Sequence, residues 1–241
     1  MSTPLKPELS WHPASFPQKP ILLHNSAMLI FQPDRELLRR FVAKHAPAMR
    51  GKILDIGGGN RRYASLFTNA TSFETVDIDP LQKPDIVASV ESLPIPDVTY
   101  DGILCTQVLG DVWDVPKAIR EMVRVLKPGG LLLITESLLN EEHDAPHDYW
   151  RFTQYTLRKL LEPSCEIRIL EPRGGYFSQR AQQAIRYRIE KHDLYHRPIL
   201  GRLAHVWARC IGTLAIKRDR SDRSDANRKF PIGYCLLAQK K

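Results

Sequence analysis

Short runs of apolar residues alternate along the chain with segments whose apolar positions recur every three or four residues. Unbroken apolar runs are typical of strands buried on both faces, and the recurring spacing is typical of amphipathic helices. Strands and helices that alternate in this way predict an open α/β fold with a parallel sheet. The pattern predicts strands at 52–56, 73–78, 85–89, 100–108, 131–137, 165–172 and 233–241, and helices at 34–46, 60–68, 115–126 and 156–163.

Two parts of the chain depart from this alternation. Residues 1–33 contain six prolines, and because proline interrupts helices and strands, we expect an irregular N-terminal arm there. The remainder, 34–241, is expected to form a single domain, with Asp34 placed to cap its first helix. Between the last two strands of this domain lies an insertion, residues 176–229.

The insertion carries the whole excess of positive charge. The net charge of the chain is +8, and residues 180–229 hold 13 Lys and Arg against 5 Asp and Glu, so the rest of the chain is neutral. Residues 198–216 have apolar side chains at helical spacing and basic side chains on the other face, which predicts a basic amphipathic helix. Residues 217–229 are polar and low in complexity, so we expect a mobile loop there.

The basic helix at 198–216 has three interpretations. It packs on the domain with its arginines solvated, it caps the substrate pocket, or it lies on a membrane surface with Trp207 near the headgroups of anionic lipids. A positive patch can also bind RNA electrostatically, but aspartates dilute the charge at 217–229 and no RNA-binding module is recognisable. We therefore expect no nucleic-acid partner.

The composition argues against several classes of protein. No uninterrupted apolar run approaches the roughly 20 residues needed to span a bilayer, and the N-terminus lacks the charged start and apolar centre of a secretory signal. The four cysteines are scattered without CxxC spacing, which argues against a zinc site or a disulfide framework. We expect a cytoplasmic protein, one that is peripheral to a membrane if the third interpretation of the basic helix holds.

Three consecutive glycines follow the first predicted strand, in the sequence GKILDIGGGN at 51–60. Glycine permits positive φ and lets a ligand approach the backbone. The stretch does not match the dinucleotide pattern GxGxxG, because position 62 is Arg, and no GK[ST] follows to make a P-loop. Taken alone, the glycines are also compatible with a purely structural turn.

A second acid favours a binding site over a structural turn. Asp77 ends the second predicted strand, 22 residues after Asp55 at the end of the first. An acid at this place can accept hydrogen bonds from both hydroxyls of a ribose, although a solvated acid at a strand end is the plainer explanation of Asp77 alone. Together with the glycines, the two acids predict a nucleoside site.

Four longer strings resemble one family. They are ILDIGGGN, TVDIDP, ESLPIPDVTYDGILCTQVLGDV and EMVRVLKPGGLLLITE, and RVLKPGG is the most specific short motif among them. Over residues 50–172 the chain resembles class I S-adenosylmethionine-dependent methyltransferases that act on small molecules. The resemblance implies S-adenosylmethionine as cofactor. It also implies a Rossmann-like seven-stranded sheet, five parallel strands plus a terminal antiparallel pair, with helices on both faces.

The resemblance also assigns residues to the cofactor. Asp55 and the backbone at Gly57 and Gly59 would hold its methionine part. The other positions are Asp77 for the ribose, Ile78 beside the adenine, Val90 and Glu91 at the edge of the adenine, and Gln107 at the methyl-transfer site. The chain departs from the family at two places, with Arg61 where a third glycine is usual and LGDV at 109–112 where related enzymes have LEHV.

Candidate catalytic residues lie in the loop after the fifth strand, NEEHDAPHDYWRFTQYTL at 140–157, and its HDYWRFT resembles a string in a subgroup of the same family. His147 is a candidate general base, oriented by Asp148, and Arg151 would bind an anionic group of the substrate. In the alternative, Arg151 pairs with Asp148 or Glu136 to fix the loop. Two further residues are expected to contact the substrate, His143 and Tyr149. We expect no metal, because the loop lacks repeated ligand spacing.

These observations predict an enzyme that transfers a methyl group from S-adenosylmethionine to oxygen, nitrogen or carbon of a small molecule, with a sugar or a lipid-linked precursor as candidates. Such a transfer needs alignment of the acceptor with the methyl group and exclusion of water. Two alternatives stay open. One is an RNA or protein methyltransferase that grips its substrate with the basic insertion, and the other is a protein that binds the cofactor without transferring its methyl group.

Overall fold

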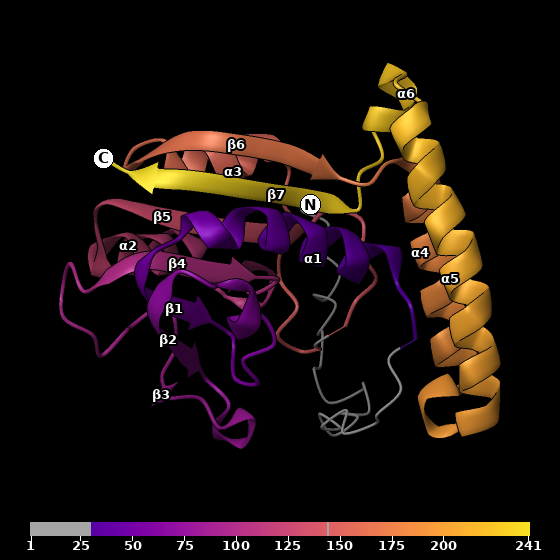
Figure 1. The fold of residues 1–241 in the computed structure, drawn as a ribbon, viewed down its shortest axis with the longest axis horizontal. Coiled ribbons are helices and arrows are strands. Elements are labelled where there is room, and N and C mark those ends of the chain that lie inside the picture. Colours follow the sequence, from indigo (N-terminus) through magenta and orange to yellow (C-terminus); the bar gives the residue numbers. More distant parts are fainter. Residues whose placement is uncertain (1–29, 144) are drawn as a thin grey trace, which may run out of the picture.

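The computed structural model describes residues 30–143 and 145–241, and its centre is one seven-stranded sheet in the order β3-β2-β1-β4-β5-β7-β6 (Figure 1). β7 is antiparallel to both of its neighbours, and the other neighbouring strands are parallel. The predicted α/β fold with a terminal antiparallel pair is therefore confirmed. The strands are β1 (Gly51–Ile56), β2 (Ala70–Asp77), β3 (Ile86–Val87), β4 (Tyr100–Thr106), β5 (Leu126–Ser137), β6 (Cys165–Arg173) and β7 (Gly233–Lys240).

Helices cover both faces of this sheet, because each turns an apolar stripe toward it. α2 and α3 bury leucine, valine and methionine side chains against one face, and α1 buries Leu38, Phe41 and Val42 against the other (Figure 1). The helices of the described residues are α1 (Pro33–His45), α2 (Val115–Val125), α3 (Gln154–Leu161), α4 (Tyr176–His192), α5 (Pro198–Ser221) and α6 (Asp225–Arg228). Short 3₁₀ turns are η2 (Ala46–Ala48), η3 (Ala64–Leu66), η4 (Pro80–Gln82), η5 (Leu109–Asp111) and η6 (Leu194–His196).

The two long helices α4 and α5 form a hairpin that stands across the edge of the sheet where the parallel strands end (Figure 1). The hairpin has an apolar cluster of its own, in which Ile185 and Ile189 of α4 meet Ala208 of α5 and Ile30. All three helices α4, α5 and α6 lie between β6 and β7 in the sequence, as the insertion at 176–229 predicts. By length and composition alone α5 could also cross a membrane, a property that the apolar runs of the sequence did not predict.

The helix predicted at 60–68 is wrong. The chain there forms turns and only the three-residue η3. Arg61 adopts a left-handed φ of 51°, which ends any helix that begins before it. Its guanidinium donates to the Phe73 carbonyl at 2.9 Å and pairs with Asp85, so contacts with β2 and the segment after it determine this conformation.

The mobile loop predicted at 217–229 is also wrong. α5 continues to Ser221, and α6 follows. The Asp219 carboxylate accepts hydrogen bonds from three backbone N–H groups at the start of α4, those of Gly175, Phe177 and Ser178, at 2.9–3.0 Å. The Asp219 carboxylate satisfies N–H groups that have no partner within α4, and its charge complements the positive end of the helix dipole. It therefore joins the last turns of α5 to the start of α4.

Asp34 does not cap α1 as predicted. The helix begins one residue earlier, at Pro33, and it has no side-chain cap. The Asp34 carboxylate instead lies 2.6 Å from Nε of Arg173 at the end of β6, and both side chains are largely buried. This ion pair connects α1 to β6, the edge strand of the sheet.

Candidate functional site

A cavity of about 840 Å³ opens where β1, β2 and β4 end. Its other walls come from η5, the 140–149 loop, and the inner faces of α1 and α4, which contribute Arg35 and Arg186. Such a crevice beyond the carboxyl ends of parallel strands is the usual ligand site of an open α/β sheet. All eight residues predicted to bind the cofactor line it: Asp55, Gly57, Gly59, Asp77, Ile78, Val90, Glu91 and Gln107.

The turn after β1 requires glycine because neighbouring side chains leave no room for a Cβ, and it also lines the cavity. Gly57 has a φ of 68°, where other residues are strained, and a Cβ added to it would lie 2.5 Å from Cγ2 of Val108. At Gly58 an added Cβ would collide with the Asp55 carboxyl group, and at Gly59 with the side chain of Gln82. The glycines therefore let the chain pass between these side chains, and their backbone forms the floor of the cavity.

Asp55 is the most unusual group in the cavity. Its side chain is buried, and among the described residues its Oδ1 atom has no hydrogen-bond partner. Burial, reinforced by the nearby charge of Asp77, raises its pKa to about 8, against the opposing effect of Arg62. A buried carboxyl without a partner fits a cationic ligand group, such as the ammonium of the methionine part of S-adenosylmethionine.

The acid at the end of β2 is placed for a ribose. Asp77 is half-buried, and one of its oxygens accepts the backbone N–H of Asp79 at 3.0 Å. Ile78 beside it is 72% exposed and lines the cavity, so it offers an apolar surface to a flat ring. Glu91 also lines the cavity, and its carboxylate accepts the N–H of Asp114 at 2.8 Å, which fixes this side chain from behind.

Gln107 is held rigidly at the end of β4. Its φ of 57° is unusual for a residue with a side chain. The amide nitrogen donates to Thr135 Oγ1 at 3.3 Å, and the amide oxygen accepts from Ser137 and from Arg173. Because both the nitrogen and the oxygen of its side-chain amide are fixed, Gln107 is suited to shape the place where the cofactor and the acceptor meet.

Sequence reasoning missed the cations of the cavity. Arg35 of α1 and Arg62 after the glycine turn both line it and are both exposed. Arg62 was noted only as a mismatch to a glycine pattern, and Arg35 only as part of a helix. Either guanidinium could bind a carboxylate or phosphate, a role that the sequence analysis had given to Arg151.

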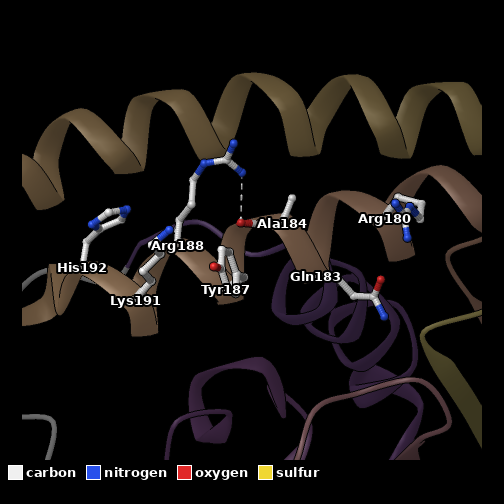
Figure 2. Close-up of a pocket in the computed structure, with 7 residues that line it drawn as sticks. All are labelled: Arg180, Gln183, Ala184, Tyr187, Arg188, Lys191 and His192. Atoms are coloured by element: carbon white, nitrogen blue, oxygen red, sulfur yellow. Dashed lines mark hydrogen bonds between the residues drawn. The ribbon is translucent and has the colours of Figure 1, made fainter.

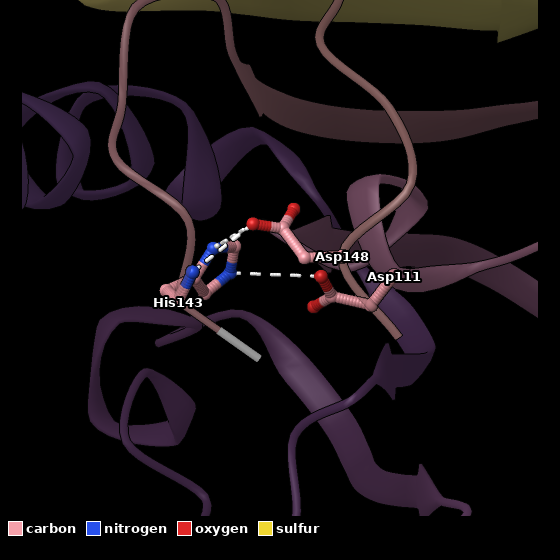
Figure 3. A group of neighbouring side chains, drawn as sticks. All are labelled: Asp111, His143 and Asp148. Carbon is pink, nitrogen blue, oxygen red and sulfur yellow. Dashed lines mark hydrogen bonds and ion pairs between the residues drawn. The ribbon is translucent and has the colours of Figure 1, made fainter. Parts of the chain in front are cut away.

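The loop at 140–149 places a histidine between two acids (Figure 3). Nδ1 of His143 lies 3.2 Å from the Asp148 carboxylate, which also accepts the His143 backbone N–H at 3.0 Å. On the other side of the ring, Nε2 lies 3.5 Å from Oδ1 of Asp111 in η5. His143 and Asp111 line the cavity, so the imidazole is oriented by Asp148 and presents its other edge to the site.

The prediction that Asp148 orients His147 is therefore wrong. Nδ1 of His147 contacts the Tyr149 hydroxyl at 2.9 Å, and Asp148 faces His143. His147 and Tyr149 both line the cavity, whereas Asp148 and Arg151 are not among the described residues that line it. Arg151 donates to both Asp148 oxygens, so the geometry matches the alternative in which this pair fixes the loop.

Asp111, His143 and Asp148 also offer three ligand atoms within 4.8 Å of one another. Both Asp148 oxygens already accept hydrogen bonds from Arg151, and one also faces His143. A metal ion would have to displace the guanidinium, and it would do so beside a fixed positive charge. The donor set therefore suits an ion-paired histidine better than it suits a metal.

Aromatic side chains form the mouth of the cavity. Trp113 is 69% exposed, and its ring centroid lies 5.2 Å from that of Tyr149 in an edge-to-face arrangement. Trp150 lies 6.3 Å from the same indole. Exposed aromatic rings grouped at a cavity mouth can stack on a planar or apolar ligand.

Comparisons with known proteins agree with this site. A family model described as a methyltransferase domain matches residues 31–192. The ubiquinone/menaquinone biosynthesis C-methyltransferase UbiE of Cronobacter sakazakii is 34% identical over 136 residues, covering 45% of this chain and 54% of that protein. UbiE of Vibrio parahaemolyticus is 36% identical over 121 residues, covering 42% and 47%. The chain thus spans about half the length of the curated relatives it matches.

Solved structures share the fold over most of the chain. The [4+2]-cyclase SpnF superimposes with a TM-score of 0.55 and 25% identity, covering 86% of this chain and 80% of that one. A putative sarcosine dimethylglycine methyltransferase from Galdieria sulphuraria has a TM-score of 0.54 and 18% identity, covering 86% and 85%. The family match spans more than half of the chain and includes the cavity. The chain therefore belongs to the methyltransferase-domain family, and the resemblance to S-adenosylmethionine-dependent methyltransferases is confirmed.

Proposed function

We propose that the protein methylates a small-molecule acceptor that carries an ionisable hydroxyl group on an aromatic ring, with His143 as the general base. The observation that supports this most directly is the placement of His143, whose ring is held by Asp148 on one side and faces the cavity on the other. A hydroxyl proton that leaves for Nε2 makes the oxygen, and the ring carbons conjugated to it, nucleophilic.

The cofactor would supply an activated methyl group, and the residues of the chain would position the acceptor and remove its proton. Asp55 would hold the ammonium of the cofactor, Asp77 would hold its ribose, and Gln107 would line the place of methyl transfer. The Asp148 carboxylate favours the tautomer of His143 with its proton on Nδ1, which leaves the lone pair on Nε2. Because Nε2 lies 3.5 Å from Oδ1 of Asp111 and both residues line the cavity, the acceptor hydroxyl would have to enter beside Asp111 to give its proton to Nε2. When bound, the cofactor would supply its methyl group as an electrophile and would leave as the uncharged thioether.

The choice of an aromatic acceptor rests on the rim formed by Trp113 and Tyr149. The matched relatives are named as C-methyltransferases of ubiquinone and menaquinone biosynthesis, and such names imply aromatic acceptors. A sugar also stacks on aromatic rings, and a lipid-linked precursor would add an apolar tail. The assay below separates an aromatic acceptor from a sugar.

We further propose that the reaction takes place in the cytoplasm, with peripheral contact to a membrane through 198–216. Support comes from the exposed apolar side chains of α5, such as Leu203 and Leu214, and from the basic charge of the insertion. An acceptor with an apolar tail would be available at such a surface.

The test is transfer of labelled methyl from S-adenosylmethionine to separate acceptor sets. One set holds naphthoquinols and benzoquinols that lack a ring methyl, a second holds sugars, and a third holds total RNA and protein. Label in the quinol set that is lost in His143→Ala, with S-adenosylhomocysteine binding intact, supports the proposal. Label confined to sugars, RNA or protein would overturn the aromatic acceptor.

A second candidate is a protein that binds the cofactor and does not transfer its methyl group. The similarity to a [4+2]-cyclase supports this candidate, because the same fold can host different reactions. Tight cofactor binding with no labelled product from any acceptor set would favour this candidate.

A further inference from the structure

The outward face of α5 carries an apolar stripe. The exposed fractions of Leu203, Val206 and Leu214 are 65%, 62% and 67%, and Cys210 between them is also exposed. These positions recur at intervals of three and four, so they lie on one side of the helix. Because burying such side chains is favourable, a continuous exposed row of them on a long helix marks a contact surface.

A basic groove runs along α4 (Figure 2). It has a volume of about 420 Å³, and all its lining residues come from one face of α4. Tyr187 is 64% exposed in its centre, and Lys191 Nζ lies 5.4 Å from the Tyr187 ring. The lining contains no Asp or Glu: Arg180, Gln183, Ala184, Tyr187, Arg188, Lys191 and His192.

The groove and the stripe join at one contact. The Arg188 guanidinium lies over the Trp207 ring of α5, 4.6 Å from its centroid. Leu203, Cys210 and Leu214 are four residues before, three after and seven after Trp207, so they lie on its side of α5. The apolar stripe therefore borders the basic groove directly.

Positive side chains also flank the other edge of the stripe. Arg202 and Arg209 are exposed there, and residues 198–218 contain no Asp or Glu. The surface thus has an apolar centre between two rows of cations. This is the charge and polarity pattern that an anionic membrane surface complements, with the apolar side chains among the acyl chains and the cations at the headgroups.

Other partners fit this pattern less well. Nucleic acid would pair with the cations and leave the apolar stripe in water. A second copy of the chain, joined about a two-fold axis, would place cations opposite cations. A membrane-spanning α5 fits its length and composition, but the inner face of α5 packs on α4 through Ala208 and Ile211, and the arginines of its outer face would enter the hydrocarbon.

We propose that α4 and α5 together form a docking surface for anionic lipid bilayers, hereafter the hairpin surface, defined by the α4 groove and by Leu203, Val206, Cys210 and Leu214. It extends the membrane contact proposed for 198–216 to a second helix and commits to negatively charged lipids. It does not depend on the identity of the acceptor. The opposite side of α4, which includes Gln182 and Arg186, lines the active-site cavity, so docking would bring the cavity wall next to the bilayer.

The test is flotation of the full chain with vesicles of pure phosphatidylcholine and with vesicles that contain phosphatidylglycerol. We expect binding only to the second kind, weakened by salt. Arg180→Glu/Lys191→Glu should weaken binding at least tenfold, and Leu203→Gln/Leu214→Gln should do the same at constant charge. Arg158→Glu/Lys159→Glu on α3 has the same change in charge and should bind as the wild type does.

S-adenosylhomocysteine binding, measured on each variant, shows that the variant folds and separates this proposal from the proposed methyl transfer. No binding of the wild type to phosphatidylglycerol vesicles would overturn the hairpin surface, as would equal losses in the α3 control. Sedimentation that shows a dimer, dissociated by Leu203→Gln/Leu214→Gln, would also overturn it in favour of self-association. Binding of RNA that competes with the vesicles and survives Leu203→Gln/Leu214→Gln would overturn it in favour of nucleic acid.

Discussion

His143 and Asp148 make two contacts with each other: the carboxylate accepts the backbone N–H of His143 at 3.0 Å and lies 3.2 Å from its Nδ1 atom. The carboxylate itself is held by Arg151, and these bonds hold its pKa below its usual value against the effect of burial. It therefore stays ionised over the range in which enzymes work. An ionised partner at Nδ1 determines both the tautomer and the direction of the ring.

His143→Ala is expected to lower kcat by 10²–10⁴, the range that general bases contribute. His147→Ala serves as the matched control, because it lies in the same loop and lines the same cavity but contacts Tyr149. It should lower kcat less than tenfold. Both variants should bind S-adenosylhomocysteine as the wild type does, and equal losses of kcat in the two would contradict the assignment of His143.

Asp77→Ala should weaken binding of S-adenosylmethionine and S-adenosylhomocysteine, measured by calorimetric titration, by about 10-fold to 100-fold. The reason is the loss of the charge-assisted hydrogen bonds to two ribose hydroxyls, which water replaces in part, so that together their removal costs about 1.5–3 kcal/mol. Asp79→Ala, which removes the carboxylate that accepts the N–H of Leu81 and the side-chain amide of Gln82 in η4, should change affinity less than threefold. An unaffected Asp77→Ala would mean that the ribose binds elsewhere.

Cofactor binding should release a proton. The pKa of Asp55 is raised to about 8 in the free protein, so its carboxyl is mostly protonated at pH 7. A bound ammonium favours the ionised form and lowers that pKa, so affinity should rise with pH up to about 8 and then level off.

Calorimetry of S-adenosylhomocysteine binding at pH 6, 7 and 8, in buffers of different ionisation enthalpy, measures this proton. Close to one proton should leave at pH 6 and fewer at pH 8. Asp55→Asn provides the control, because it should bind weakly and without proton release. Release of the same number of protons by wild type and Asp55→Asn would place the titrating group elsewhere.

The strands and the cofactor residues could be predicted because their signals are local. The apolar residues within 52–56 and 131–137 indicate buried strands. Asp55 and the glycines after the first strand meet Asp77 because parallel strands end at one edge of the sheet. The strand at 131–137 begins five residues earlier in the structure, across Pro128 and two glycines that usually mark a turn.

The errors concern contacts between distant segments. Asp219 looked like part of a polar loop because its partners, Gly175 to Ser178, lie more than 40 residues away. The second acid beside the His143 ring, Asp111, lies over 30 residues before it in the sequence. Periodicity and composition contain no information about such pairings, since they follow from how the elements pack.

Arg173 should be a main determinant of stability. Its guanidinium is 1% exposed, pairs with Asp34 at 2.6 Å and donates to Gln107 at 3.3 Å. Arg173→Met would leave the Asp34 carboxylate buried without its partner, a change that typically costs about 3–5 kcal/mol of unfolding free energy. Because Arg173 also supports Gln107, we expect lower methyl transfer as well.

Urea unfolding at pH 7 measures this loss. Arg168→Met is the matched control on the same strand, where the side chain is 48% exposed and pairs with Glu166, and it should change the unfolding free energy by less than about 1 kcal/mol. The double variant Asp34→Leu/Arg173→Met should recover part of the loss, because no buried charge of the pair then remains unpaired. A single variant as stable as wild type would show that water or another group solvates Asp34, and that α1 does not need this ion pair to hold the wall of the cavity.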